Sequence, residues 1–127
     1  MTRVLLVDDD EQVRRYVGRV LQAAGYHTVI ASDAIEAAGA AMAEEPFDVL
    51  LTDLMMPEVD GEELARRLRD VQPDLPVLYL TGYSDRLFAE RRVLPDGHAF
   101  LDKPCTPRGL LEALALLTAP ALAASAV

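Results

Sequence analysis

Five short apolar runs alternate with segments of helical period along this chain, and this alternation limits the folds that the chain can adopt. The runs are rich in Val, Ile, Leu and aromatic residues and span residues 3–8, 26–31, 48–53, 76–81 and 98–103. The first, third and fourth are nearly continuous in apolar residues, which is typical of strands buried on both faces of a parallel sheet. The pattern predicts a doubly wound α/β fold in which right-handed crossovers place helices on both faces of the sheet.

The segments between these runs predict helices that each bury one apolar stripe. Asp33, Asp60 and Thr106 stand where a side chain can cap a first turn, and Gly25 ends the first helix. The segment at 85–94 has an irregular stripe that Pro95 cuts short, so we expect a short helix there. The residues expected to be buried in the other four helices are Val13, Tyr16, Val17, Val20 and Leu21; Ile35, Ala38 and Met42; Leu64, Leu68 and Val71; and Leu110, Leu114 and Leu117.

Composition and charge exclude several classes of protein. With 127 residues and 51% apolar composition, the chain suits one domain, expected at 3–118 and followed by an Ala-rich tail at 119–127. No apolar run reaches the roughly 18 residues of a membrane span and the N-terminus turns acidic early, which together predict a soluble, cytoplasmic protein. Cys105 is the only cysteine, so an intrachain disulfide is excluded. The formal net charge of −9 opposes nucleic-acid binding by this domain.

Polar residues follow four of the five apolar runs at the point where each run ends. They are Asp8 and Asp9, Asp53, Thr81 and Lys103. Because function in such sheets gathers beyond the carboxyl ends of the strands, where the strand order reverses, we expect these five residues to converge on one rim. Three carboxylates close together would raise one another's pKa, so the site needs a cation, and oxygen ligands favour Mg²⁺.

Asp53 raises a question of its own, because an apolar run ends on a bare carboxylate. A buried, unpaired carboxylate would cost several kcal/mol, so we expect Asp53 to be exposed at the rim and compensated by the metal and Lys103. Lys103 is the only lysine among the 12 Lys and Arg residues. That exception suggests that a compact point charge is needed where a guanidinium would not fit.

Four motifs, in this order and spacing, resemble the receiver domain of two-component response regulators. They are VDDD at 7–10, TDLMMPEVDG at 52–61, LTG at 80–82 and DKP at 102–104. The resemblance covers roughly residues 3–118 and implies a flavodoxin-like (βα)5 domain with strand order 2-1-3-4-5. The TGYSD stretch and short fourth helix are similar to receivers fused to hybrid histidine kinases, whereas Gly82 and Cys105 depart from the usual family residues.

The resemblance also implies the role of each residue. Asp53 would accept a phosphoryl group from a phosphohistidine, while Asp9, Asp53 and the backbone carbonyl of Met55 would bind Mg²⁺ and Asp8 would act through water. Thr81 and Lys103 would each contact a phosphate oxygen. Phe100 would be the switch aromatic that turns inward when Thr81 moves, changing the face formed by helix 4, strand 5 and helix 5.

Further implications concern partners and turnover. The donor would be a sensor histidine kinase or a histidine phosphotransfer protein, and the helix 4, strand 5 and helix 5 face would allow a homodimer. Such a domain catalyses its own phosphorylation and autodephosphorylation and turns over no separate substrate.

Other classes of protein compete with this interpretation. Haloacid-dehalogenase-type phosphatases also use a strand-end aspartate, Mg²⁺, a threonine and a lysine, and Asp8 with Asp10 mimics their DxD motif. A flavodoxin-like flavin binder would need a glycine- and hydroxyl-rich phosphate loop after the first strand, and the acidic VDDDEQ would repel that phosphate. A pseudo-receiver used only for docking would lack part of the acidic site.

Simpler roles account for the remaining polar residues. Asp8, Asp9 and Asp10 could serve as an acidic helix N-terminus, and for Asp10 a cap is the expected role. We expect no chemistry from His27, His98 or Cys105. The arginines expected on solvated helix faces are Arg14, Arg15, Arg19, Arg66, Arg67 and Arg69.

Overall fold

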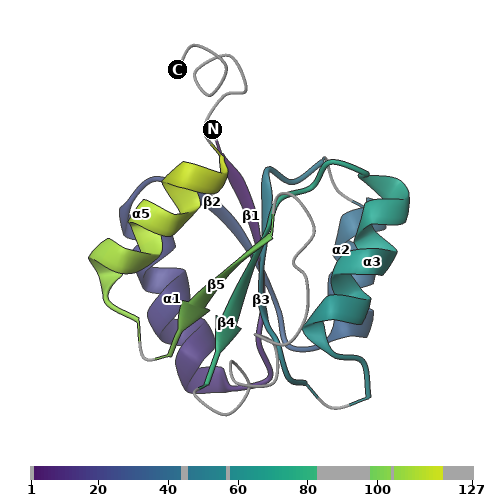
Figure 1. Cartoon of the computed structure of the whole chain (residues 1–127), viewed down its shortest axis with the longest axis horizontal. Coiled ribbons are helices and arrows are strands. Elements are labelled where there is room, and N and C mark those ends of the chain that lie inside the picture. The colour runs from purple at the N-terminus through teal and green to yellow at the C-terminus, as the bar shows by residue number, and fades with distance from the viewer. Residues whose placement is uncertain (1, 44–45, 57, 83–97, 104, 119–127) are drawn as a thin grey trace.

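A parallel sheet with helices on both faces forms the body of the protein (Figure 1). The computed structural model describes residues 2–43, 46–56, 58–82, 98–103 and 105–118. The expected fourth helix at 85–94, the Pro104 peptide and the tail at 119–127 lie outside these residues. Within the described part of the chain, no helix is both long and apolar enough to span a membrane.

The sheet has five parallel strands in the order β2-β1-β3-β4-β5, as predicted. The strands are β1 Arg3–Val7, β2 His27–Ala31, β3 Val49–Asp53, β4 Val77–Thr81 and β5 His98–Asp102. Every residue of β3 and β4 is buried, which confirms that continuous apolar runs indicate inner strands of a parallel sheet. The order reverses between β1 and β3, so their carboxyl ends meet at the switch point.

Helices α1 and α5 cover one face of the sheet, and α2 and α3 cover the other (Figure 1). Their bounds are α1 Glu11–Ala23, α2 Ala34–Ala43, α3 Gly61–Val71 and α5 Pro107–Leu117. The predicted caps are confirmed, because Asp60 accepts a hydrogen bond from the Glu63 N–H and Thr106 from the Gly109 N–H. Gly25 has a φ of +92°, the left-handed conformation that lets the chain turn out of α1.

Two apolar clusters, one on each side of the sheet, form the core. Alternate strand residues point to opposite faces, so Leu5 and Leu50 pack toward α2 and α3 while Leu6 and Leu51 pack toward α1 and α5. The expected stripe of α5 is confirmed, with Leu110 and Leu114 fully buried. Because both clusters include residues of β1 and β3, packing on the two faces holds these strands, and therefore their carboxyl ends, in place.

The buried face of α2 differs from the prediction. Ile35 and Met42 were expected inside, but they are 74% and 80% exposed, and Ala34 and Ala37 are buried instead. Because α2 is almost entirely apolar, its sequence has too little polar contrast to define one face. The small alanine side chains let the helix lie close to the sheet.

Three further side chains are also placed differently from the prediction. Val71, in the last turn of α3, is 64% exposed. Tyr16 is 41% exposed because its hydroxyl reaches outward to donate to the Cys105 carbonyl at 2.8 Å. Arg69 does not extend into solvent, since its guanidinium donates two hydrogen bonds to the Leu75 carbonyl.

The side chain of Gln72, at the end of α3, makes two hydrogen bonds to the backbone of Phe47, just before β3. It accepts from the Phe47 N–H at 3.0 Å and donates to the Phe47 carbonyl at 2.6 Å. Gln72→Ala leaves both backbone groups of a buried residue without these partners, so we expect the free energy of unfolding to fall by about 1–3 kcal/mol. Urea denaturation measures the loss, and Gln22→Ala on the exposed face of α1 is the matched control. An equal effect of the two variants would contradict this role for Gln72.

Candidate functional site

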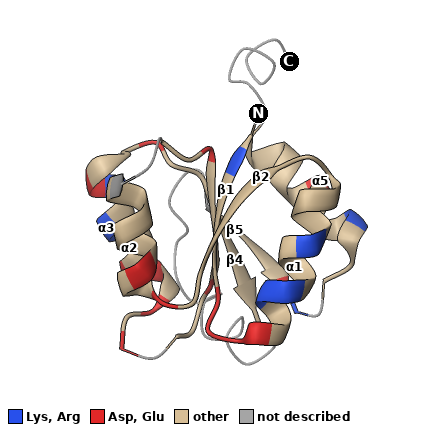
Figure 2. Ribbon diagram, turned by 180° about the vertical axis from the view of Figure 1, so that it is seen from behind, with Lys and Arg blue, Asp and Glu red and all other residues tan. Residues whose placement is uncertain are grey.

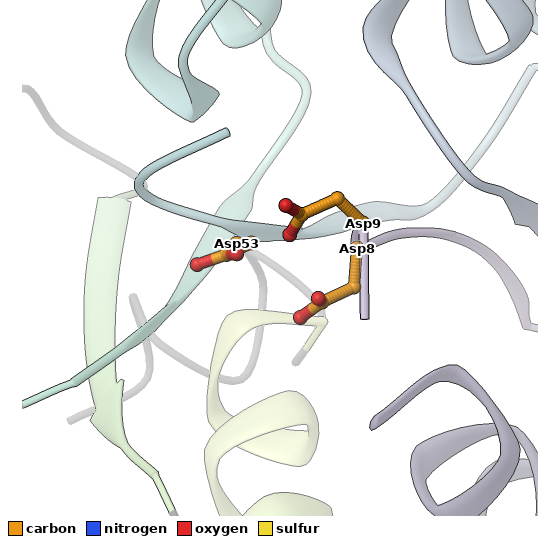
Figure 3. Close-up of side chains that lie close together, drawn as sticks. All are labelled: Asp8, Asp9 and Asp53. Atoms are coloured by element: carbon orange, nitrogen blue, oxygen red, sulfur yellow. The ribbon is translucent and has the colours of Figure 1, made fainter. Parts of the chain in front are cut away.

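Three carboxylates converge where β1 and β3 end (Figure 3). Taking one carboxylate oxygen from each of Asp8, Asp9 and Asp53, these atoms all lie within 4.8 Å of one another. The convergence follows from the sheet register, because Val7 is paired with Thr52 and the next residue of each strand is acidic. The prediction that these aspartates share one rim is confirmed.

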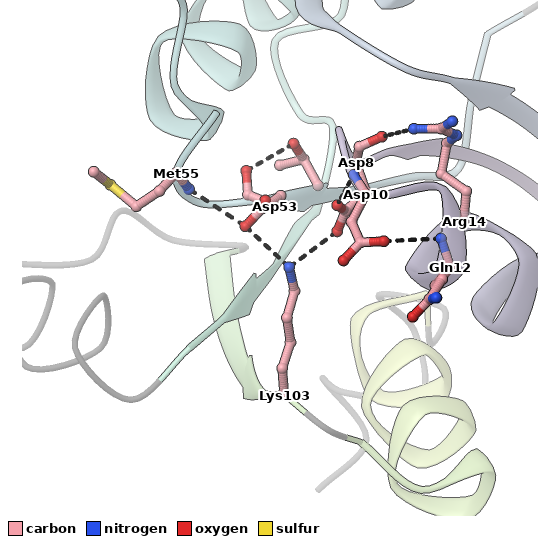
Figure 4. Close-up of polar contacts among 8 residues, drawn as sticks. Asp8, Asp10, Gln12, Arg14, Asp53, Met55 and Lys103 are labelled. Atoms are coloured by element: carbon pink, nitrogen blue, oxygen red, sulfur yellow. Dashed lines mark hydrogen bonds and ion pairs between the residues drawn. The ribbon is translucent and has the colours of Figure 1, made fainter. Parts of the chain in front are cut away.

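Lys103 reaches the same point from β5, which lies beyond β4 in the sheet (Figure 4). Its Nζ lies 3.1 Å from Asp8 Oδ2 and 3.3 Å from Asp53 Oδ1. Its backbone N–H donates to the Thr81 carbonyl at 2.7 Å, which fixes the start of the side chain against the end of β4. One ammonium group therefore bridges carboxylates from two strands.

The expectation that Asp53 is exposed is wrong. Asp53 is only 5% exposed and Asp8 is fully buried, whereas Asp9 is exposed. The chain tolerates this burial because Lys103 supplies the opposite charge and because the loop after β3 supplies a backbone donor, with the Met55 N–H 3.4 Å from Asp53 Oδ1. The side chain of Met55 itself is 49% exposed, so Met55 enters the site through its backbone.

Burial and repulsion by a neighbouring carboxylate raise the pKa of both inner carboxyls. Burial raises the pKa of Asp53 to about 7, with Asp8 adding to the rise and Lys103 opposing it. Burial also raises the pKa of Asp8, against hydrogen bonding from the Asp10 N–H and the charge of Lys103. Burial alone would lower the pKa of Lys103, but Asp8 and Asp53 together outweigh it and leave that pKa raised.

The oxygen atoms of this site suit a hard divalent cation. Asp8 Oδ2 is buried and, among the described residues, makes no hydrogen bond of good geometry, its contact with Lys103 being an ion pair. Burial raises the pKa of Asp53 to about 7, so a further positive charge would favour its ionised form. Lys103 is the one cation that the described residues place against these carboxylates, and such a group fits Mg²⁺, which binds one or two carboxylates and keeps several waters.

Asp10 takes no part in the carboxylate group. Its side chain accepts a hydrogen bond from the Gln12 N–H at 2.8 Å and caps α1, as predicted. The Asp10 N–H in turn donates to Asp8 Oδ1 at 2.9 Å. The DxD pair of a phosphatase, which would need Asp8 and Asp10 to act together, is therefore not formed.

Thr81 and Phe100 lie on β4 and β5, the two strands next to β3 on the side away from β1. Thr81 is fully buried, and its hydroxyl donates to Asp102 Oδ1 at 3.4 Å. Phe100 is half-buried, with its ring centroid 5.4 Å from that of Tyr79 and the planes inclined at 42°. Thr81 ends β4 at the predicted rim, whereas Phe100 lies within β5, two residues before its end.

Two residues of the site were missed from sequence. Arg14, expected on a solvated face, donates from Nη1 to the Asp8 carbonyl at 2.7 Å. Gly61 lies where the start of α3 meets the end of β3, and its N–H donates to the Leu54 carbonyl at 2.8 Å. Gly61 is the last residue of the TDLMMPEVDG motif and directly follows the capping Asp60, but no role was assigned to it from sequence.

Gly61 allows a backbone approach that a side chain would prevent. A Cβ at this position would overlap the Asp53 carbonyl oxygen and lie 3.2 Å from Leu54 Cα. We expect Gly61→Ala to lower the free energy of unfolding by about 1–3 kcal/mol, because the loop carrying Asp53 must shift.

Gly39, in the middle of α2, is the matched control in urea denaturation. A Cβ there would meet nothing within 4 Å. Gly39→Ala should raise the free energy of unfolding by about 0.5–1 kcal/mol. A gain in both variants would show that the close approach at Gly61 is not needed.

Comparison with known proteins gives one consistent result. The response regulator receiver domain family matches residues 4–115. The response regulator receiver protein CpdR of Brucella abortus is 40% identical over 112 residues, 88% of this chain and 92% of CpdR. The C4-dicarboxylate transport transcriptional regulatory protein DctD of Pseudomonas aeruginosa is 34% identical over 89% of this chain but only 24% of DctD. The chemotaxis protein CheY4 of Vibrio cholerae has a TM-score of 0.78 at 30% identity, covering 92% of this chain and 98% of that structure.

Proposed function

This chain belongs to the response regulator receiver domain family, and from that premise we propose that Asp53 accepts a phosphoryl group in a two-component phosphorelay. The donor would be the phosphohistidine of a sensor histidine kinase or a histidine phosphotransfer protein. The observation that carries the proposal is the convergence of Asp8, Asp9 and Asp53 with the Lys103 ammonium at the end of the sheet.

The chemistry follows from the charges of the site. A carboxylate oxygen of Asp53 attacks the phosphorus atom, the phosphorus–nitrogen bond breaks, and its electron pair returns to the imidazole nitrogen. Lys103, already 3.3 Å from Asp53 Oδ1, offsets the negative charge that arrives with the phosphoryl group. Mg²⁺, held by Asp9, Asp53 and the Met55 carbonyl with Asp8 acting through water, would supply further neutralisation of the phosphoryl oxygens.

Phosphorylation would act on the fold through Thr81. Its hydroxyl would leave Asp102, 3.4 Å away, and donate to a phosphoryl oxygen. That movement would open room for the half-buried Phe100 to turn inward, a shift between two packings of one domain. The affected face would comprise β5, α5 and the segment at 85–94 that was expected to form a helix, and it would serve for partner binding or homodimer formation.

In this role the protein would act in signalling in the cytoplasm and would turn over no separate substrate. The domain would catalyse its own phosphorylation and slow self-dephosphorylation, and its formal net charge of −9 disfavours nucleic-acid binding by this domain alone. A phosphatase of the haloacid-dehalogenase type has less support, because Asp10 caps α1 and does not join Asp8. Steady turnover of an aryl phosphate, lost in Asp8→Ala but retained in Asp53→Ala, would favour that phosphatase instead.

Incubation with acetyl phosphate and Mg²⁺, followed by intact mass measurement, tests the proposal. We expect the mass to increase by a single phosphoryl group, and we expect Asp53→Asn or removal of Mg²⁺ with a chelator to prevent it. Asp33→Asn, at the start of α2 and away from the site, is the control and should be phosphorylated like the wild type. Phosphorylation that persists in Asp53→Asn would reject Asp53 as the acceptor.

A further inference from the structure

We infer that Arg14 is a positioning residue for the acidic site, holding the main chain between Asp8 and Asp9 in the orientation that binds a divalent cation. The inference rests on the proposed function only in taking Mg²⁺ as that cation. Figure 2 shows basic residues of α1 following directly on the acidic turn at its start. Arg14, Arg15 and Arg19 are the arginines of this helix, and they differ in what they contact.

Arg14 turns back past the start of α1 to reach the end of β1 (Figure 4). Its Nη1 donates to the Asp8 carbonyl at 2.7 Å, and the side chain is half-buried. Arg15, the next residue, is 70% exposed on its side chain and pairs with Glu11 at 3.0 Å. A hydrogen bond from a charged donor is shorter and about twice as strong as one from a neutral donor. Arg14 therefore restrains the Asp8 carbonyl more firmly than a neutral donor would.

The Asp8 carbonyl lies where the strand ladders no longer hold the chain. Pairing of β1 with β2 and β3 ends at Val7, and the Asp8 N–H still donates to the Ala31 carbonyl at 3.3 Å. Beyond that bond, the chain leaves the sheet toward α1. The Arg14 guanidinium therefore takes the place of a strand partner for the first carbonyl after the ladder.

This carbonyl belongs to the peptide unit that joins the two acidic residues. A change of the backbone at that peptide would break the bond from Arg14 and would shift the point from which the Asp9 side chain extends toward Asp53. The Asp8 side chain has its own restraint, because its Oδ1 accepts from the Asp10 N–H at 2.9 Å. Asp9 is exposed, so the contact with Asp53 and the peptide held by Arg14 together set the position of its carboxylate.

The test is the affinity for Mg²⁺, measured by isothermal titration calorimetry without any phosphoryl donor. We expect Arg14→Met to weaken Mg²⁺ binding by about 10-fold, as for other residues that orient metal ligands. Arg14→Lys, which keeps a charged donor, should recover part of the affinity. Arg15→Met is the matched control and should bind Mg²⁺ within about twofold of the wild type, because Arg15 contacts only Glu11 among the described residues.

A second measurement needs no metal. In ¹⁵N NMR spectra of the metal-free protein, the Asp9 amide shares its peptide unit with the Asp8 carbonyl, so its resonance should move in Arg14→Met and stay in place in Arg15→Met. Arg14→Gln replaces Arg14→Met in both measurements if the Met variant does not fold. Wild-type Mg²⁺ affinity in the folded Arg14 variant would overturn the inference, as would a wild type that binds no Mg²⁺.

These outcomes remain separate from those of the proposed function. A wild type that binds Mg²⁺ but never takes a phosphoryl group on Asp53 would defeat the proposed function and leave the role of Arg14 standing. Phosphorylation of wild-type Asp53, together with unchanged Mg²⁺ affinity in Arg14→Met, would defeat the role of Arg14 and leave the proposed function standing.

Discussion

Asp53→Asn is expected to stabilise the metal-free protein at about pH 8 by about 2–4 kcal/mol. The pKa of the buried Asp53 carboxyl is raised to about 7 from 3.8, so folding forces an ionised group into a poorly solvated place beside Asp8. An asparagine of the same shape removes this penalty. Urea denaturation in the presence of a chelator measures the gain, and Asp33→Asn at the exposed start of α2 is the control.

The stability gained by Asp53→Asn should increase as the pH rises. Between the unfolded pKa of 3.8 and the folded value of about 7, the native protein binds more protons at Asp53 than the unfolded chain does. Wild-type stability therefore falls as the pH rises through this window, and the gain from Asp53→Asn grows over the same range. The slope that remains in the variant comes from Asp8, whose pKa burial also raises. A gain that is equal at both ends of the window would contradict the burial penalty.

Lys103→Met should lower the free energy of unfolding by about 3–5 kcal/mol at about pH 8. Lys103 Nζ contacts Asp8 and Asp53 at 3.1 and 3.3 Å, and its removal leaves two buried carboxylates without a counter-charge. The loss should shrink at about pH 5, because the carboxyls can then take up protons and become neutral. Urea denaturation at the two pH values measures the difference.

Two further variants separate charge from packing at this position. Lys103→Arg keeps the charge and should lose less stability than Lys103→Met at high pH. The double variant Lys103→Met with Asp53→Asn removes one charge of each sign and should recover much of the loss. A Lys103→Met variant with the same deficit at both pH values would show that Lys103 acts by packing alone.

The inner strands were predictable from sequence because they depend on patterns that are local and strong, whereas the full strand order came from the family resemblance. Continuous apolar runs at 48–53 and 76–81 indicated inner strands, and the strands within them, β3 and β4, proved to be buried at every residue. Caps such as Asp60 and Thr106 are equally local, since each acts on an N–H three residues away. The buried face of α2 was not predictable, because Ile35 and Met42 look no less buried in sequence than Ala34 and Ala37.

The members of the site were predictable, but their surroundings were not. Strand ends and the lone lysine identified Asp8, Asp9, Asp53 and Lys103, and the structure brings all four together. The burial of Asp53 depends on Lys103 crossing the end of β4 from a position 50 residues later, a tertiary contact that no local pattern encodes. The contact of Arg14 spans only six residues, but it was not predictable either, because the position of Arg14 on α1 gave only the face it occupies.

Chemical mapping of the phosphoryl group tests the central claim most directly. The protein is phosphorylated with acetyl phosphate and Mg²⁺, the acyl phosphate is reduced with borohydride to the alcohol, and the peptides are identified by mass. The account predicts that the reduced residue is Asp53, within the LLTDLMMP stretch, and that no other peptide is changed. Reduction at Asp8 or Asp9, or a phosphoryl group that resists borohydride, would contradict it.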